Sequence, residues 1–167
     1  MKSFLNILML SLGLNVAGIV GPAHATSPLL AQCSDDSVGL RGDWGKMRFR
    51  VDVADNDAER GQGLMFVRNM DRDKGMLFVW DAPRRAQFWM RNTYIPLDMI
   101  FVDEAGVVTH VHHNAVPLDE TVIDGGEGVF AVLEINGGLS RSFGIDVGSQ
   151  LQHPAFGSAA AWPCGSV

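Results

Sequence analysis

Hydrophobic and polar residues alternate along several short stretches of this sequence, a pattern typical of strands with one buried face. The clearest case spans residues 47–53, where Met47, Phe49 and Val51 alternate with charged side chains. Other short runs, some of them continuously apolar, predict further strands at 76–80, 87–93, 97–103, 107–113, 129–135 and 148–151. We therefore expect a chain that is rich in short strands.

A short helix is predicted directly after the 47–53 strand. Asn56 is followed three residues later by Glu59, which is the capping-box pattern of a helix N-terminus, and Asp55 is an alternative cap. Gly61 or Gly63 then ends the helix after only a few turns.

Residues 139–143 form a second predicted helix, which ends before Gly144. Many short strands and few helical turns predict an α+β fold class that is β-rich, with a strongly curved sheet or partly open β-barrel packed against two short helices.

No internal repeat or domain boundary interrupts the pattern of strands and helices. We expect one domain at 46–152, preceded by a loosely ordered N-terminal segment at 26–45 and followed by a C-terminal tail at 153–167.

The first 25 residues have the features of a secretory signal peptide. Lys2 precedes an apolar stretch at 4–20, and the small residues Ala23 and Ala25 occupy both positions that a signal peptidase recognises. An uncleaved membrane anchor is the alternative, but glycine and asparagine residues interrupt the apolar stretch. We therefore expect a periplasmic or secreted protein with no stable membrane anchor after cleavage.

The two cysteines, Cys33 and Cys164, lie near opposite ends of the exported part of the chain. Because export leads to an oxidising compartment, we interpret them as one disulfide that joins the termini. Metal binding and a catalytic thiol are alternatives, which the absence of a Cys-x-x-Cys spacing disfavours.

Composition places the chain among ordinary globular proteins, since 47% of its 167 residues are hydrophobic and 19% are charged. The formal net charge of −6 leaves no basic excess for a nucleic-acid backbone, so we expect no nucleic-acid partner.

The sequence has no Walker loop, dinucleotide-binding fingerprint, serine-hydrolase elbow or zinc-protease motif. We therefore expect no cofactor, and the lack of these motifs favours binding over catalysis.

Side chains suited to ligand binding are densest in one short segment. Arg91 offers a planar guanidinium for a carboxylate or phosphate, and Trp89, on the same predicted strand face, offers a flat apolar surface. Asn92, Thr93 and Asp98 follow closely. Together they predict a site for a sugar ring or an acidic small molecule. In the alternative interpretation, Arg91 pairs with Asp98 across a tight turn and the cluster only supports the fold.

Glu134 and Asn136 are further candidate ligand-binding residues, because they lie two apart on one predicted strand and share a face. If the fold brings Asp98 near Glu134, the two carboxyl groups could serve as acid and base or nucleophile in glycan hydrolysis. Alternatively, Glu134 is solvated or caps the helix at 139–143.

His110 and His112 also share a strand face and could bind one metal ion. An exported chain with eight methionines also suggests copper, although most of these methionines occupy apolar strand positions and no third ligand is evident. We treat these two histidines as weak candidates for a metal site.

Three groups of residues occur in an order typical of one protein family. They are Val53-Ala54-Asp55 with Glu59-Arg60 and Gly63-Leu64-Met65; Gly75-Met76-Leu77-Phe78 with Phe88-Trp89-Met90-Arg91-Asn92-Thr93 and Ile95-Pro96-Leu97-Asp98; and Leu133-Glu134-Ile135-Asn136-Gly137-Gly138 with Gly144-Ile145 and Val147-Gly148. This pattern, over roughly residues 49–151, resembles domain-of-unknown-function family 192. The resemblance implies a small secreted or periplasmic β-rich domain and no particular reaction.

The chain departs from this family pattern in two places. Ser149 stands where the family usually has an aspartate, and Asn136-Gly137-Gly138 replaces an Asn-Ala-Gly sequence. The histidines and cysteines discussed above lie outside the family motifs, so any function built on them would be particular to this chain.

From these observations we expect a non-catalytic exported domain that binds a small ligand or a cell-envelope polymer, saccharide-like in character. The candidate binding residues are Trp89, Arg91, Asn92, Thr93, Asp98, Glu134 and Asn136. A glycan hydrolase that uses Asp98 and Glu134, and a periplasmic metal-binding protein, are the two alternatives.

Overall fold

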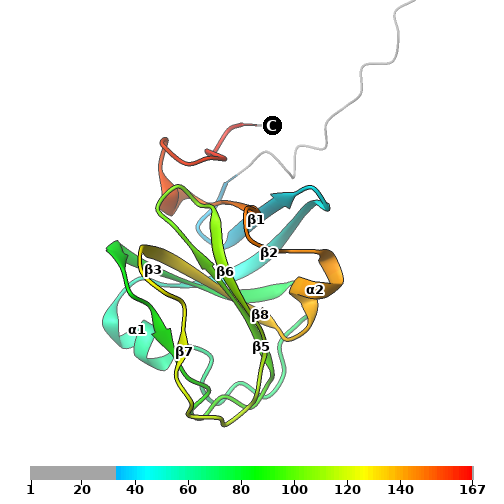
Figure 1. Ribbon diagram of the computed structural model, residues 1–167, viewed down its shortest axis with the longest axis vertical. Coiled ribbons are helices and arrows are strands. Elements are labelled where there is room, and N and C mark those ends of the chain that lie inside the picture. The colour runs from blue at the N-terminus through cyan, green and yellow to red at the C-terminus, as the bar shows by residue number, and fades with distance from the viewer. Residues whose placement is uncertain (1–32, 167) are drawn as a thin grey trace, which may run out of the picture.

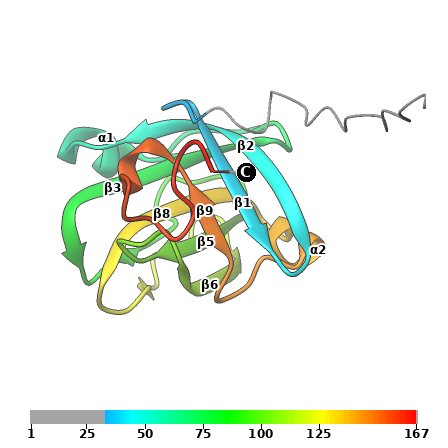
Figure 2. The same cartoon turned by 90° about the horizontal axis from the view of Figure 1, so that it is seen from above.

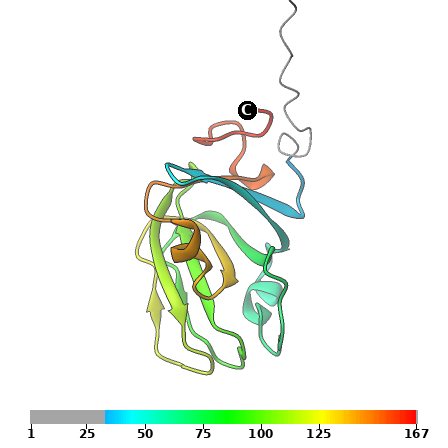
Figure 3. The ribbon, with the colours of Figure 1, turned by 90° about the vertical axis from the view of Figure 1, so that its right-hand side faces the viewer.

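The computed structural model describes residues 33–166, so the predicted signal peptide at 1–25 lies outside the described residues. A seven-stranded sheet, strongly curled into a half-barrel, dominates the fold (Figure 1). Figure 3 shows the curl from the side, with α2 on one side and α1 near the lower edge. The predicted β-rich α+β fold with two short helices is confirmed.

The described elements are β1 (Ser37–Gly42), β2 (Gly45–Ala54), α1 (Asp57–Gln62), β3 (Lys74–Arg84), β4 (Gln87–Phe88), β5 (Leu97–Val102), β6 (Val108–Ala115), β7 (Ile123–Asp124), β8 (Val129–Asn136), α2 (Leu139–Phe143), β9 (Gln150–Gln152) and a 3-10 turn (Pro154–Phe156). The predicted strands and helices are present with shifted bounds, and β1 and β7 are additional strands that the sequence did not predict. The large sheet has the order β6-β5-β8-β3-β2-β1-β9, and β4 pairs with β7 in a separate two-stranded ribbon.

Strands β2 and β3 are parallel, whereas the other neighbours in the large sheet are antiparallel. Parallel neighbours need a crossover connection, and here the connection contains α1. The helix begins as the sequence predicts, because the Asn56 side chain accepts a hydrogen bond from the Glu59 backbone N–H at 3.0 Å. Gly63 ends it with a left-handed φ of 48°.

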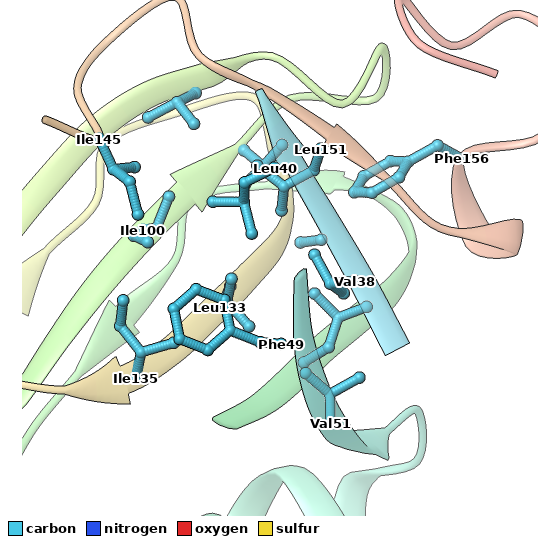
Figure 4. Close-up of a cluster of buried hydrophobic side chains, with 14 of the residues drawn as sticks. Val38, Leu40, Phe49, Val51, Ile100, Leu133, Ile135, Ile145, Leu151 and Phe156 are labelled. Atoms are coloured by element: carbon cyan, nitrogen blue, oxygen red, sulfur yellow. The ribbon is translucent and has the colours of Figure 1, made fainter. Parts of the chain in front are cut away.

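The sheet separates two clusters of buried apolar side chains. Leu133 and Ile135 of β8 belong to the first core cluster, which Figure 4 shows together with residues from β1, β2, β5 and β9. Val132 belongs to the second core cluster, which also contains Phe78 and Met99. Side chains alternate along a strand, so Glu134 shares the face of the second core cluster.

The N-terminal segment is more regular than the sequence predicts. Residues 37–42, expected within a loosely ordered segment, form β1, which lies between β2 and β9 (Figure 2). Val38 and Leu40 on this strand are fully buried. In the tail, Phe156 and Trp162 are buried as well, so both ends of the described chain contribute to packing.

Cys33 and Cys164 form the predicted disulfide, with their Cα atoms 5.6 Å apart and a sequence separation of 131. The bond joins the start of the described chain to the tail, and both lie above the sheet in Figures 1 and 3. No helix within residues 33–166 is long and apolar enough to cross a membrane.

The segment predicted as a strand at 87–93 is a strand only at Gln87–Phe88. Beyond it the chain turns, because the Thr93 backbone N–H donates to the Met90 carbonyl at 3.1 Å. Two backbone hydrogen bonds from neighbouring loops hold this turn. The Phe66 N–H donates to the Asn92 carbonyl, and the Leu118 N–H donates to the Thr93 carbonyl. The turn therefore presents Trp89 and Arg91 at the surface.

Candidate functional site

A cleft of about 450 Å³ opens on the face of the sheet that carries the second core cluster. One side is formed by α1 and the turn after it, and the other by the end of β3, by β4 and by the turn at 89–93. Glu134 of β8 lines its inner part, which we call the floor because this side chain is buried. We refer to this feature as the cleft throughout.

Aromatic rings form one wall of the cleft. The Phe88 ring lies edge-on to Phe78 at a centroid distance of 5.2 Å and to Trp80 at 6.2 Å. It also contacts Phe101 of the core at 5.9 Å, so the sheet holds the wall in place. Trp89 follows at the mouth and is 46% exposed, which leaves its ring available to a ligand.

Arg60 links α1 to β3 at the edge of the cleft. Its Nη1 donates to the Val79 carbonyl at 2.8 Å, and its Nη2 pairs with Asp57 at 2.7 Å. The guanidinium also lies 5.8 Å from the centre of the Trp80 ring. These contacts attach α1 to β3 and occupy donor groups of Arg60 within the protein.

Arg84 and Arg91, by contrast, have unoccupied donors. Arg84 lies 5.7 Å from the Trp80 ring centre and Arg91 lies 5.6 Å from that of Trp89, both within the range of a cation–π contact. Within residues 33–166, neither guanidinium donates a hydrogen bond or forms an ion pair. Arg85, also in the cleft, is paired with Asp124 and Glu127.

Glu134 is the unusual group of the cleft. The side chain is 4% exposed and lies opposite Met76 of β3 and Met99 of β5 in the sheet register. Its carboxyl group has no hydrogen-bond partner in the described part of the chain. Burial raises its pKa to about 8, because an ionised carboxylate is poorly solvated there. At neutral pH, Glu134 is therefore predominantly a neutral acid that can donate a proton in a hydrogen bond.

Asp98 lies on the opposite face of the sheet from Glu134. It pairs with Ile135, whereas Met99 pairs with Glu134, and directly opposed residues share a face. The Asp98 carboxylate accepts hydrogen bonds from four donors, at 2.7 to 2.9 Å: the backbone N–H groups of Asn114, Gly138 and Ser140, and the Ser140 hydroxyl. The structure does not bring the two carboxyl groups together, and Asp98 holds the start of α2.

The other predicted site residues divide between the cleft and the framework around it. Trp89, Arg91, Thr93 and Glu134 line the cleft. Asn92 and Asn136 do not: the Asn92 carbonyl accepts from Phe66, and the Asn136 amide donates to the Met70 and Asp71 carbonyls. Arg91 does not pair with Asp98, whose acceptor sites are taken by other donors.

His110 and His112 lie on β6 opposite Phe101 and Met99, so they share a face as predicted. The pKa of His112 is lowered, first by burial and then by the neighbouring His110 and His113. Within residues 33–166, no group of three or more histidine, cysteine, aspartate or glutamate side chains is placed to hold a metal ion.

Sequence reasoning missed part of the cleft, chiefly Arg60, Trp80 and Arg84. Trp80 was expected only as part of the strand at 76–80, and Arg60 only as part of the family pattern. The predicted strand ends at Trp80, before Pro83, whereas β3 continues to Arg84 after a register shift beyond Val79. No apolar–polar alternation in the sequence marks this extension, which carries Arg84 to the cleft.

The family model DUF192, described as an uncharacterised family, matches residues 40–153. The chain belongs to the DUF192 family. The match covers more than half of the chain and confirms the resemblance in its sequence motifs.

This DUF192 protein is also similar to two crystal structures. A protein of unknown function from Novosphingobium aromaticivorans shares 43% identity at a TM-score of 0.68, over 69% of this chain and 82% of its own. A putative transcription regulator from Sinorhizobium meliloti shares 39% identity at a TM-score of 0.69, over 71% of this chain and 93% of its own. No curated protein matches the chain significantly.

Proposed function

We propose that this DUF192 protein is an exported domain that binds a saccharide-like small ligand in the cleft. The observation that carries the proposal is the aromatic wall of Trp80, Phe88 and Trp89 beside the guanidinium groups of Arg84 and Arg91, which have no hydrogen-bond or ion-pair partner within residues 33–166. Sugar rings stack on aromatic side chains, and their hydroxyl groups accept hydrogen bonds from planar donors such as guanidinium.

The size of the cleft supports a ligand of one or a few rings. Its volume of about 450 Å³ falls in the range of roughly 300–1,000 Å³ that is usual for small-molecule sites. The wall residues are packed against the core through Phe101, so the site is largely formed before a ligand arrives.

Two features support export. The N-terminal 25 residues have the pattern of a signal peptide, and the Cys33–Cys164 disulfide suits an oxidising compartment.

Other functions have less support. A hydrolase that uses Asp98 with Glu134 would need both carboxyl groups at one bond, and they face opposite sides of the sheet. The Sinorhizobium relative is named a putative transcription regulator, but a net charge of −6 gives this chain no basic excess for DNA.

The proposal can be tested by titrating the protein with neutral and acidic monosaccharides and measuring binding by NMR and by isothermal calorimetry. We expect Trp89→Ala and Arg91→Ala each to weaken binding by about tenfold or more, because each removes one part of the platform. Arg68→Ala is the matched control: Arg68 lies 4.9 Å from the Tyr94 ring in a similar cation–π contact, but outside the cleft. Undiminished binding in both cleft variants would overturn the site.

A further inference from the structure

We propose that the ligand of the cleft is a sugar acid, and that Glu134 recognises its carboxylate by donating an O–H hydrogen bond to it. This inference rests on the proposed function, since it specifies the chemical class of the ligand in the same cleft.

The Glu134 carboxyl has no hydrogen-bond partner within residues 33–166. A buried polar group without a hydrogen bond costs free energy, and native proteins leave few of them. Glu134 is 96% buried but lines the cleft, and its neighbours across the sheet are Met76 and Met99, which offer no strong acceptor. A ligand that reaches the floor can supply the missing partner.

The charged side chains that line the cleft around Glu134 carry an excess of positive charge. The other ionisable groups that line the cleft are Asp57, Arg60, Arg84, Arg85 and Arg91. Asp57 pairs with Arg60, and Arg85 pairs with acidic residues of the β7–β8 segment. In the described part of the chain, Arg84 and Arg91 of the cleft therefore have no acidic partner, and their positive charges attract an anion and repel a cation.

Protonation of Glu134 makes its carboxyl group a hydrogen-bond donor. Burial keeps the pKa of this carboxyl at about 8, so near neutral pH it is a donor. A bound anion favours the neutral form still further. One proton shared between the protein carboxyl and the ligand carboxylate gives a short, strong hydrogen bond of the charge-assisted type.

A carboxylate on a sugar ring satisfies all three features together. Its flat group accepts a paired hydrogen bond from one guanidinium and still has a lone pair for the Glu134 proton. The ring attached to it is available to stack on the aromatic wall. A neutral sugar would leave the two arginines uncompensated, and a cationic ligand would face their repulsion.

The inference predicts a definite pH dependence. Only the protonated form of Glu134 can donate a hydrogen bond. The affinity for a sugar acid is therefore highest below the pKa of about 8 and falls as the pH rises through it. For galacturonate we expect an affinity about 30-fold weaker at pH 9.5 than at pH 6.5, which is the ratio of protonated fractions. The arginines stay charged over this range.

The experiment is isothermal calorimetry with galacturonate, galactose, acetate and inorganic phosphate at these two pH values, with circular dichroism to verify folding. We expect galacturonate to bind most tightly and to lose affinity at high pH. Glu134→Gln keeps a donor that cannot ionise, so its galacturonate binding should no longer depend on pH. Glu134→Leu removes the donor and leaves no unpaired polar group in its place, so it should reduce the preference for galacturonate over galactose and abolish the pH dependence of that preference.

The outcomes separate the two proposals. Galactose binding as tightly as galacturonate, a wild-type affinity independent of pH, or stronger binding of phosphate would each overturn the sugar-acid inference and leave the saccharide site intact. Binding of no sugar, with Trp89→Ala silent, would overturn the proposed function and the inference with it.

Discussion

Asp98 and Glu134 lie on adjacent strands, yet their surroundings are opposite. A one-residue offset in the β5–β8 register places one carboxyl on each face of the sheet. Asp98 accepts hydrogen bonds from four donors, whereas Glu134 has no partner in the described chain. The first carboxyl therefore stabilises the fold, and the second is available to a ligand.

The role of Asp98 leads to a prediction for Asp98→Asn. An amide supplies only one acceptor oxygen and points an N–H₂ group at other donors around Ser140, so we expect a loss of about 2–4 kcal/mol in the free energy of unfolding. Urea denaturation measures it. The control is Asp52→Asn, which breaks only an exposed ion pair to Lys74 and should cost less than about 1 kcal/mol. Equal losses in both variants would contradict the structural role of Asp98.

The raised pKa of Glu134 makes a prediction about stability. In the unfolded chain this carboxyl ionises near its ordinary value of 4.5, but in the folded protein only near 8. The folded state is therefore increasingly disfavoured as pH rises from 4.5 to 8, on the order of 3–5 kcal/mol in total. We expect the stability of Glu134→Gln, measured by urea denaturation, to rise relative to wild type over this interval. Parallel pH profiles would show that Glu134 ionises normally.

At the scale of elements, the aromatic wall of the cleft depends on the ribbon of β4 and β7. The Gly125 backbone N–H, just after β7, donates to the Ala86 carbonyl at 2.9 Å, and the Ala86 N–H donates to the Gly126 carbonyl at 3.2 Å. A Cβ on Gly125 would overlap the ring of Phe101. The close approach of this turn to the core thus places Phe88 and its neighbours.

We predict that Gly125→Ala destabilises the protein by about 1–3 kcal/mol and weakens ligand binding, because the turn must move away from Phe101. Thermal unfolding and sugar titration measure the two effects. Gly61→Ala is the control for stability: an added Cβ in α1 meets no atom within 4 Å, and alanine favours a helix by up to about 1 kcal/mol. A Gly125→Ala protein as stable as wild type would show that the turn is adaptable.

Alternation of apolar and polar residues predicted β2 and β6, because a strand with one buried face carries this signal. Largely apolar runs predicted β5 and β8, which are buried on both faces. Neither pattern predicted β1, which follows a stretch rich in serine and aspartate. One of its two partners, β9, lies more than 100 residues further along the chain, and no local pattern reveals such a partner. The parallel pairing of β2 with β3 is also non-local, because α1 and its loops separate the two strands.

The candidate site was predictable in part. Trp89, Arg91 and Thr93 could be found because one turn presents them together. Glu134 could be found because it lies two residues before Asn136 on a predicted strand, so that both share a face. Its separation from Asp98 could not, since the face of each residue depends on a register that the sequence does not state.

At the scale of the whole molecule, the Cys33–Cys164 disulfide is a long-range constraint. It closes a loop over a sequence separation of 131 residues, and the chain-entropy model assigns about 4–5 kcal/mol to a loop of this length. We expect reduction, or the Cys33→Ser and Cys164→Ser double variant, to lower the free energy of unfolding by about this amount. Sugar binding should remain, because α1 beside the cleft lies well below the joined termini (Figures 1 and 3).

The pairing of β1 with β9 has a consequence for the time course of folding. The second strand of this pair is made only after Gln150 has left the ribosome, so this edge of β1 stays open while residues 43–149 emerge. Cys33 emerges 131 positions before its partner Cys164. The native disulfide therefore forms only after residues 33–164 have all emerged, and its appearance marks a polypeptide in which β1 and β9 are both present.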